Sequence, residues 1–333
     1  MPSTTNKLSN THTMPSSQTP QPLLPWKTRL QIYFLTAATD AVRRSNGTVN
    51  RRLMNFLDRK THPNKAPINA VSVQDVTVDA TRNLWFRLFT PAAAAAGLPV
   101  VIFFHGGGFA FLSPDSFVYD AFCRRLCRRV PAVVVSVNYR HTPEHRWPSQ
   151  YDDGEDVLKF LAENPGVLPE NADVSKCFLA GDSAGANIAH HVAVRVGKSG
   201  LRGIRVVGLV SIQPWFGGEG GTAAEERLDA VPIVSVARTD WLWKAFLPAG
   251  SDRDHGDLSG LDYPETVVFV GGFDPLQDWQ KRYYEWLKNC GKKAELIEYP
   301  TMIHAFYLFP ELPESSEFIS QVKDFITKRI SHL

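Results

Sequence analysis

The stretch "KCFLAGDSAGANIAHHVAV", residues 176–194, decides the fold, because it reads as a strand, a turn and the start of a helix. Its apolar run at 177–180 predicts a buried strand, and the apolar spacing after the turn is typical of a helix. Between them lies "GDSAG", residues 181–185, whose glycines permit a sharp turn that exposes the hydroxyl of Ser183. Such a serine is either a turn residue or a nucleophile, and Gly-x-Ser-x-Gly alone does not distinguish the two.

The rest of the chain alternates in the same way. Strands are expected at 74–79, 84–90, 100–104, 132–138, 176–180, 206–215, 266–272 and 294–300. Helices are expected at 30–57, 151–164, 185–196, 277–290 and 316–330, with a loop at 63–68. Strands followed by helices imply a mostly parallel sheet covered on both faces, which is the α/β class.

Polar residues come just beyond several of these strands. Ser183, Asp274 and His304 each follow a predicted strand, in that order along the chain. The carboxyl ends of parallel strands lie along one rim of the sheet, where ligands bind. We therefore expect these three side chains to lie on the same rim.

The three residue types suit nucleophilic catalysis. Serine is a poor nucleophile until a base removes its proton, and His304, with an ordinary pKa of ~6.5, suits that role. Asp274 can accept a hydrogen bond from the other ring nitrogen and fix the tautomer. Each residue singly also fits a structural role, Asp274 as a helix cap before Pro275 and His304 as a loop histidine. All three together at strand ends favour a triad.

A glycine run, residues 106–108, follows the strand at 100–104. The backbone N–H groups of Gly107 and Gly108 can approach a developing oxyanion closely, and the N–H of Ala184 adds a third donor. A phosphate-binding loop is the rival interpretation. Neither Gly-Lys-Ser/Thr nor Gly-x-Gly-x-x-Gly follows, which disfavours it.

The composition excludes several classes of protein. The 333 residues carry a formal net charge of +2, so no strong field favours nucleic acid or an anionic membrane. No apolar run approaches the ~20 residues of a membrane helix. Four cysteines without metal-ligand spacing indicate free thiols in a reducing compartment, and we expect a cytoplasmic protein. Residues 1–22 are rich in Ser, Thr, Pro and Asn, which predicts a disordered tail.

Five motifs in order carry a resemblance to a known family: "HGGGF" (105–109), "VNYRHTPEHRWPSQYDDG" (137–154), "GDSAGAN" (181–187), "GGFDPLQD" (271–278) and "MIHAFY" (302–307). The sequence resembles plant carboxylesterases of the hormone-sensitive-lipase-like group of α/β hydrolases. The resemblance implies an α/β-hydrolase fold with an eight-stranded, mostly parallel sheet flanked by helices. It also implies a single domain at 23–333, with a helical cap from the N-terminal segment (about 25–62). Residues 217–261 interrupt the strand–helix alternation, which predicts an insertion that belongs to the cap.

The resemblance implies site residues as well. Ser183, Asp274 and His304 would form the triad, and Gly107, Gly108 and Ala184 the oxyanion hole. Aromatic residues flank the proposed site, and of these we expect Phe109 and Trp215 to line an apolar pocket.

The expected function is hydrolysis of small, moderately apolar esters through an acyl-enzyme, without cofactor or metal, by a monomer or homodimer. The family also contains the gibberellin receptor, which lacks the triad histidine, dehydratases with threonine at the nucleophile position, and cyclases. Ser183 and His304 are both present here, which disfavours the receptor and the dehydratase. A hormone-receptor-like ligand binder and a non-hydrolytic lyase or cyclase stay open as alternatives.

Overall fold

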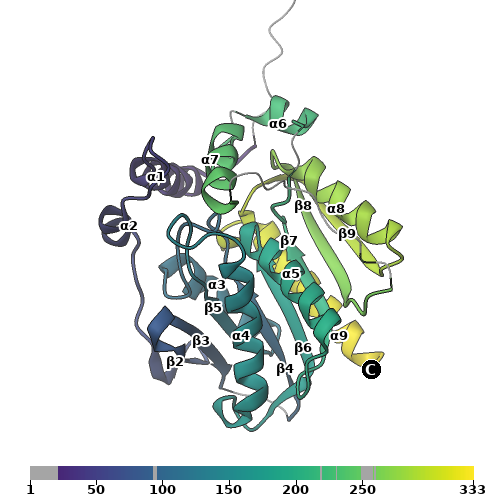
Figure 1. Cartoon of the computed structure of the whole chain (residues 1–333). Coiled ribbons are helices and arrows are strands. Elements are labelled where there is room, and N and C mark those ends of the chain that lie inside the picture. The colour runs from purple at the N-terminus through teal and green to yellow at the C-terminus, as the bar shows by residue number, and fades with distance from the viewer. Residues whose placement is uncertain (1–21, 93–95, 218–219, 230, 249–257, 259) are drawn as a thin grey trace, which may run out of the picture.

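A mixed sheet of nine strands forms the centre of the part of the chain that the structure describes (Figure 1). The structure is a computed structural model, and it describes residues 22–92, 96–217, 220–229, 231–248, 258 and 260–333. The expected tail, residues 1–22, lies outside the described residues except for its last residue. The extent of the domain, 23–333, stays a prediction.

The strands follow the order β1-β2-β3-β5-β4-β6-β7-β8-β9 across the sheet. From β5 to β9 every neighbouring pair is parallel, whereas β1, β2 and β3 join that block through antiparallel pairs. The strands are β1 (Asn64–Ile68), β2 (Val71–Asp79), β3 (Leu84–Pro91), β4 (Leu98–Phe104), β5 (Val133–Asn138), β6 (Ala172–Asp182), β7 (Val206–Ile212), β8 (Glu265–Phe273) and β9 (Ala294–Ile303).

All eight expected strands are present, and β1 is an additional one, so the sheet has nine strands and not the expected eight. The segment 63–68 was expected to be a loop, but β1 pairs antiparallel with β2 at the edge of the sheet. Most of its residues are exposed, and Pro67 lies within it. Because this edge strand buries so little, it shows no apolar alternation, and proline is tolerated at an edge.

Helices cover both faces of the sheet. The α-helices are α1 (Trp26–Val42), α2 (Arg51–Leu57), α3 (Phe117–Arg129), α4 (Ser149–Glu163), α5 (Ala184–Ser199), α6 (Ala223–Leu228), α7 (Val236–Phe246), α8 (Gln277–Asn289) and α9 (Pro313–Ser331). Short 3₁₀ helices span Ala80–Arg82, Pro165–Val167 and Phe306–Leu308. Helices α3 and α9 pack together on one face, and α4 and α5 pack on the other. None of the described helices combines the length and hydropathy that a bilayer crossing requires.

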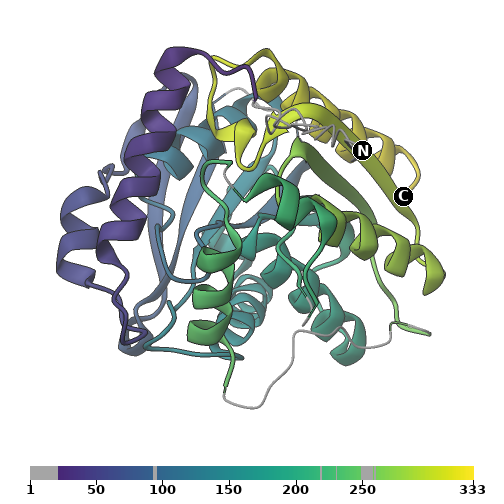
Figure 2. The same ribbon diagram turned by 90° about the horizontal axis from the view of Figure 1, so that it is seen from above.

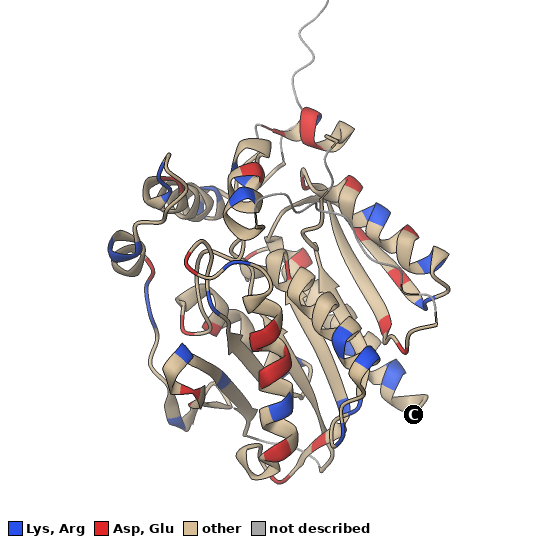
Figure 3. Cartoon of the chain, viewed as in Figure 1, with Lys and Arg blue, Asp and Glu red and all other residues tan. Residues whose placement is uncertain are grey.

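The buried strands show why their sequences are apolar throughout. In β4, Val101 and Phe103 belong to one hydrophobic core, and Val100, Ile102 and Phe104 belong to the other. Successive side chains of a strand point to opposite faces, so a strand between two helix layers needs apolar residues at every position. Figure 3 shows the charged residues spread over the surrounding helices, with both signs interspersed.

A helical cap lies over the carboxyl ends of the parallel strands (Figures 1 and 2). The helix expected at 30–57 is two helices, α1 and α2, because the chain turns at Gly47, where φ is +81°. Asn50 then caps α2 by accepting a hydrogen bond from the N–H of Leu53. The cap is completed by α7, which comes from the predicted insertion.

The N-terminal helix is attached near its start to the body and near its end to α7 of the cap. Near its start, Thr28 donates a 2.7 Å hydrogen bond to Glu311. Near its end, Asp40 forms an ion pair with Arg238 of α7. The indole N–H of Trp241 on α7 also donates to the carbonyl of Arg44. The cap is therefore one structure built from two segments that lie about 200 residues apart in the sequence.

The fit between α5 and β4 generates a stability prediction. A Cβ atom on Gly185 would lie 1.9 Å from the carbonyl oxygen of Phe104. The Gly185→Ala variant should therefore lose about 3 kcal/mol or more of unfolding free energy, because backbone must move. Gly166→Ala is the matched control, since no described atom lies within 4 Å of the added Cβ. Urea denaturation measures both, and equal midpoints would contradict the close packing.

Candidate active site

Ser183 lies at a tight turn between the end of β6 and the start of α5. Its φ of 52° and ψ of −119° are a strained conformation for a non-glycine residue. The turn requires glycine at 181, because a Cβ there would lie 2.3 Å from the carbonyl oxygen of Gly185. The sequence "GDSAG" thus folds into the strand-to-helix turn that its glycines predicted.

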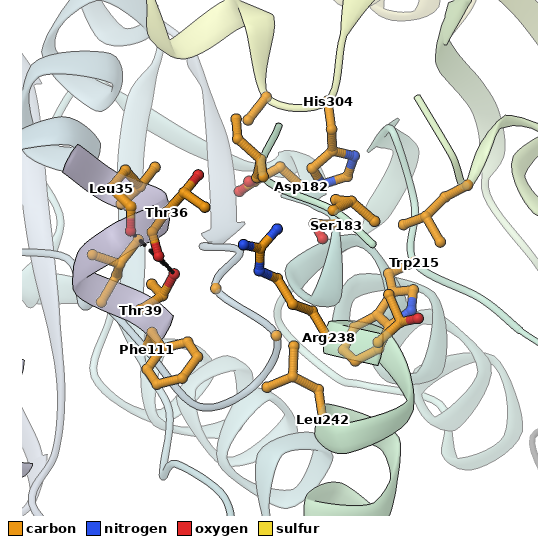
Figure 4. Close-up of a pocket in the computed structure, with 18 of the residues that line it drawn as sticks. Leu35, Thr36, Thr39, Phe111, Asp182, Ser183, Trp215, Arg238, Leu242 and His304 are labelled. Atoms are coloured by element: carbon orange, nitrogen blue, oxygen red, sulfur yellow. Dashed lines mark hydrogen bonds between the residues drawn. The ribbon is translucent and has the colours of Figure 1, made fainter. Parts of the chain in front are cut away.

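The structure brings His304 and Asp274 together on the same rim. Asp274 directly follows β8, and His304 directly follows β9. The Nδ1 atom of His304 lies 2.6 Å from Oδ2 of Asp274, and both side chains are buried. In Figure 4 the imidazole lies beside Ser183. The Nδ1–Oδ2 contact leaves Nε2 as the ring nitrogen available to other groups.

Burial and charge act in opposite directions on His304. Burial alone lowers the pKa of the imidazole, because the charged form loses its hydration. The charge and hydrogen bond of Asp274, with a smaller effect from the charge of Asp182, outweigh burial and raise the pKa above 6.5. Asp274 therefore stabilises the protonated histidine.

Two glutamines hold Asp274 in place. The side-chain N–H₂ of Gln213 donates to Oδ2 of Asp274 at 3.1 Å, and that of Gln280 donates at 2.7 Å. The N–H of Leu276 donates to Oδ1 at 2.9 Å. Gln213 also accepts from the N–H of Ala305 at 2.7 Å, which fixes the loop that carries the histidine. Sequence reasoning missed both glutamines, although Gln213 is a polar residue directly after an apolar strand.

The glycine run adopts conformations that other residues rarely reach. Gly107 has φ of +101° and Gly108 has φ of +61°. A Cβ on Gly107 would lie 2.3 Å from the carbonyl oxygen of Phe111. Among the hydrogen bonds of the described residues, none uses the N–H of either glycine as donor. Ala184 is the first residue of α5, so its N–H has no acceptor within the helix.

Asp182 connects this loop to the serine turn. Its carboxylate accepts hydrogen bonds from the N–H of Gly106 at 2.8 Å, from the hydroxyl of Tyr119 at 2.7 Å and from the hydroxyl of Tyr307 at 2.6 Å. Burial raises the pKa of Asp182 to about 6, and these hydrogen bonds oppose the rise. The sequence predicted Asp182 only as part of the turn.

A cavity of about 110 Å³ opens at Ser183 between the rim and the cap (Figure 4). Its lining comes from the serine turn, the glycine run, α1, α7 and the loop after β9: Leu35, Thr36, Thr39, Arg43, Gly107, Gly108, Phe111, Leu112, Tyr119, Asp182, Ser183, Trp215, Ile233, Val234, Arg238, Thr239, Leu242, Leu276, His304, Ala305 and Leu308. The described residues contain no cluster of three or more His, Cys, Asp or Glu that could hold a metal ion.

The two expected pocket residues lie in different places. Trp215 lines the cavity. Phe109 is fully buried behind it, with its ring stacked on Phe246 at 3.8 Å and 5.3 Å from the ring of Trp215. Sequence reasoning did not find the cavity's arginines, Arg43 and Arg238, because both come from the cap, which the strand-end argument does not cover.

A family profile described as the α/β-hydrolase fold matches residues 101–308. The chain belongs to the α/β-hydrolase fold family, within the group that resembles hormone-sensitive lipase.

Relatives in plants include both receptors and esterases. The chain is 40% identical to the gibberellin receptor GID1C of Arabidopsis thaliana, over 91% of this chain and 94% of the receptor. It is 33% identical to carboxylesterase 20 of the same species, over 87% of this chain and 95% of that protein. Among solved structures, the hyperthermophilic esterase of Pyrobaculum calidifontis is 28% identical with a TM-score of 0.72, covering 92% of this chain and 99% of the esterase.

The balance of effects on His304 gives a testable titration. In the wild-type protein the pKa of His304 should lie above 6.5, and Asp274→Asn should bring it below 6.5, because burial then outweighs the remaining charge of Asp182. NMR of protein with labelled histidines measures both values, and His304→Gln assigns the resonance. Asp324→Asn, at an exposed position of α9, is the charge-matched control. A wild-type value below 6.5 would contradict the argument.

The role of Gln213 is tested through stability. Gln213→Leu leaves the buried N–H of Ala305 without its acceptor and removes a donor from Ile303 and Asp274. We expect a loss of about 2 kcal/mol or more of unfolding free energy. Gln31→Leu, at an exposed position of α1, should change it by less than about 0.5 kcal/mol. Equal urea midpoints for the two variants would show that Gln213 does not hold the loop.

Proposed function

We propose that the protein is a serine carboxylic ester hydrolase, with Ser183, His304 and Asp274 as its triad. One observation carries the proposal. Ser183, in a strained turn, lines the same cavity as His304, and the Nδ1 atom of His304 is hydrogen-bonded to the buried carboxylate of Asp274. A structural serine, or a histidine satisfied within a loop, would not require that the two line the same cavity.

The first half of the reaction forms an acyl-enzyme. The Oγ atom of Ser183 attacks the ester carbonyl carbon, and its proton passes to Nε2 of His304. The carbonyl oxygen becomes an oxyanion, which accepts hydrogen bonds from the N–H groups of Gly107, Gly108 and Ala184. When the intermediate collapses, the bond to the alcohol breaks, and His304 returns the proton to the leaving oxygen.

The second half regenerates the serine. A water molecule attacks the acyl carbon, His304 takes one of its protons, and a second oxyanion forms in the same place. Its collapse releases the carboxylic acid and returns the proton to Ser183. Asp274 stabilises the imidazolium in both halves, and no cofactor takes part in either.

The cavity supports a small substrate. Its volume of about 110 Å³ is below the roughly 300–1,000 Å³ of sites for drug-sized ligands. Apolar side chains such as Leu35, Phe111 and Leu242 make up much of the wall. Small, moderately apolar esters are therefore the proposed substrates.

We also propose a cytoplasmic location, as a monomer or homodimer. Cys123, Cys127 and Cys177 are buried free thiols, which supports a reducing compartment. Burial raises the pKa of the thiols of Cys127 and Cys177 to about 12, so neither competes with Ser183 as a nucleophile.

A second candidate function is ligand binding without turnover. The 40% identity to a gibberellin receptor over nearly the whole chain favours it. The presence of His304 opposes it, because the family resemblance implies that gibberellin receptors lack the triad histidine. The two functions differ in a simple observable, because a receptor binds its ligand and leaves it unchanged.

Hydrolysis of p-nitrophenyl acetate and p-nitrophenyl butyrate tests the proposal. The wild-type protein should release p-nitrophenol with an initial burst, and Ser183→Ala or His304→Gln should lower kcat by about 10⁴-fold or more. Ser199→Ala and His145→Gln, which change the same residue types away from the cavity, are the controls.

Three outcomes are informative. Loss of activity in the Ser183 and His304 variants only would support the ester hydrolase. A folded wild-type protein that hydrolyses neither ester would overturn it in favour of the ligand binder or the cyclase. Activity that survives in Ser183→Ala would point to a lyase or cyclase that uses the same cavity.

A further inference from the structure

The cap end of the cavity carries positive charge. Arg238, on α7, and Arg43, directly after α1, both line the cavity. Figure 4 shows Arg238 extending from α7 into the space between α1 and Ser183. Two guanidinium groups in a small, largely apolar cavity are costly unless something compensates for their charge.

Asp40 compensates for only part of the positive charge of the two arginines. Arg238 holds the carboxylate of Asp40 with two hydrogen bonds, of 2.9 Å from Nε and 2.6 Å from Nη2. Arg43 contacts the same carboxylate through its own Nη2. The hydrogen bond from Arg238, followed by that from Arg43, lowers the pKa of Asp40, so it is ionised at neutral pH. These three side chains together carry a charge of +1, and the carboxylate of Asp229 also acts on Arg238, contributing to the rise of its pKa.

Donors remain unused in the cluster. Asp40 occupies two of the five N–H groups of Arg238. The Nε atom of Arg43 is buried and has no acceptor among the described residues, and the same holds for the hydroxyl of Thr36, which also lines the cavity. Both residues line the cavity, so these donors can be offered to an acceptor on a ligand.

The end of the cavity near Ser183 contains a carboxylate instead of arginines. Asp182 lies beside Ser183 at the rim, and its carboxylate is already bound by one backbone N–H and two tyrosine hydroxyls. The cavity lining contains four side chains whose charge can act on a ligand: Asp182, His304, Arg43 and Arg238. Tyr119 also lines the cavity, but burial raises its pKa and keeps its hydroxyl neutral. Among the charged side chains of the lining, the two arginines lie at the cap and the carboxylate of Asp182 lies at the rim, so an anionic substituent away from the reacting ester is attracted to the cap.

We propose, on the basis of the ester hydrolase function above, that the substrates carry a carboxylate at the end remote from the ester. The ester carbonyl lies at Ser183, and the carboxylate lies against Arg238 and Arg43. A guanidinium group matches the planar, two-oxygen shape of a carboxylate.

A purely structural role is the competing explanation. In that case the arginines fasten α1 to α7 through Asp40 and have no effect on substrate choice. The two explanations differ for variants of Asp40, because its loss weakens the fastening but raises the positive charge of the cavity.

The test compares two esters of equal size. 4-Acetoxybenzoate carries a carboxylate opposite its ester, and 4-acetoxybenzamide carries a neutral amide in the same place. Both kcat/KM values are corrected for spontaneous hydrolysis. A variant that loses activity on both esters alike leaves their ratio unchanged. In the wild-type protein the ratio should favour the acid by about tenfold or more, as expected of a charge-assisted hydrogen bond.

Variants that change the charge of the cluster should change the acid-to-amide ratio of kcat/KM. Asp40→Asn raises the cluster charge to +2 and should raise the preference for the acid. Arg238→Gln lowers the charge to zero and should abolish the preference. The Asp40→Asn/Arg238→Gln double variant restores +1 and should lie between the two. Arg195→Gln, which breaks an ion pair on α5 outside the cavity, should leave the ratio unchanged.

The outcomes separate the inference from the function on which it rests. A wild-type ratio near one, or a fall in the ratio for both Asp40→Asn and Arg238→Gln, would overturn the carboxylate site while leaving the hydrolase standing. If neither ester is hydrolysed, the p-nitrophenyl ester assay decides the hydrolase, and calorimetric binding of the same two compounds to Ser183→Ala protein decides the site. Tighter binding of the acid, lost with Arg238→Gln, would support it, and equal binding would refute it.

Discussion

The buried carboxylate of Asp182 is the contact on which the arrangement of the site depends. It receives donors from the loop after β4, from α3 and from the loop after β9, and it lies one residue before Ser183. A carboxylate without water is costly, and three short hydrogen bonds compensate for that cost. The serine turn, the glycine run and the histidine loop are thereby held against one another by a single side chain.

Most of the fold follows from the sequence, for a physical reason. The strands of the parallel block are buried on both faces, so their apolar runs are continuous, and β4 is the clearest case. The positions of Ser183, Asp274 and His304 after β6, β8 and β9 follow from the same pattern, because a parallel sheet brings its carboxyl ends together. Their catalytic roles stay a proposal.

The elements that sequence reasoning missed lack a periodic signal. Strand β1 lies at an edge and buries little, so nothing in its sequence alternates. The break between α1 and α2 depends on one glycine with positive φ, inside a stretch whose apolar spacing continues through it. Gln213, Arg43 and Arg238 take their importance from partners that are far away in the chain, and only the folded structure shows those partners.

The division of the cavity wall between two segments has an evolutionary consequence. The loops at the strand ends supply the end of the wall that contains Ser183 and His304, whereas α1 and α7 supply the opposite end. Substitutions on the cap can therefore accumulate without disturbing the packing that holds Ser183. A single scaffold can in this way acquire new ligand preferences, and lose or keep turnover, through independent changes. The coexistence of receptors and esterases among the relatives of this chain is what such a separable architecture would produce.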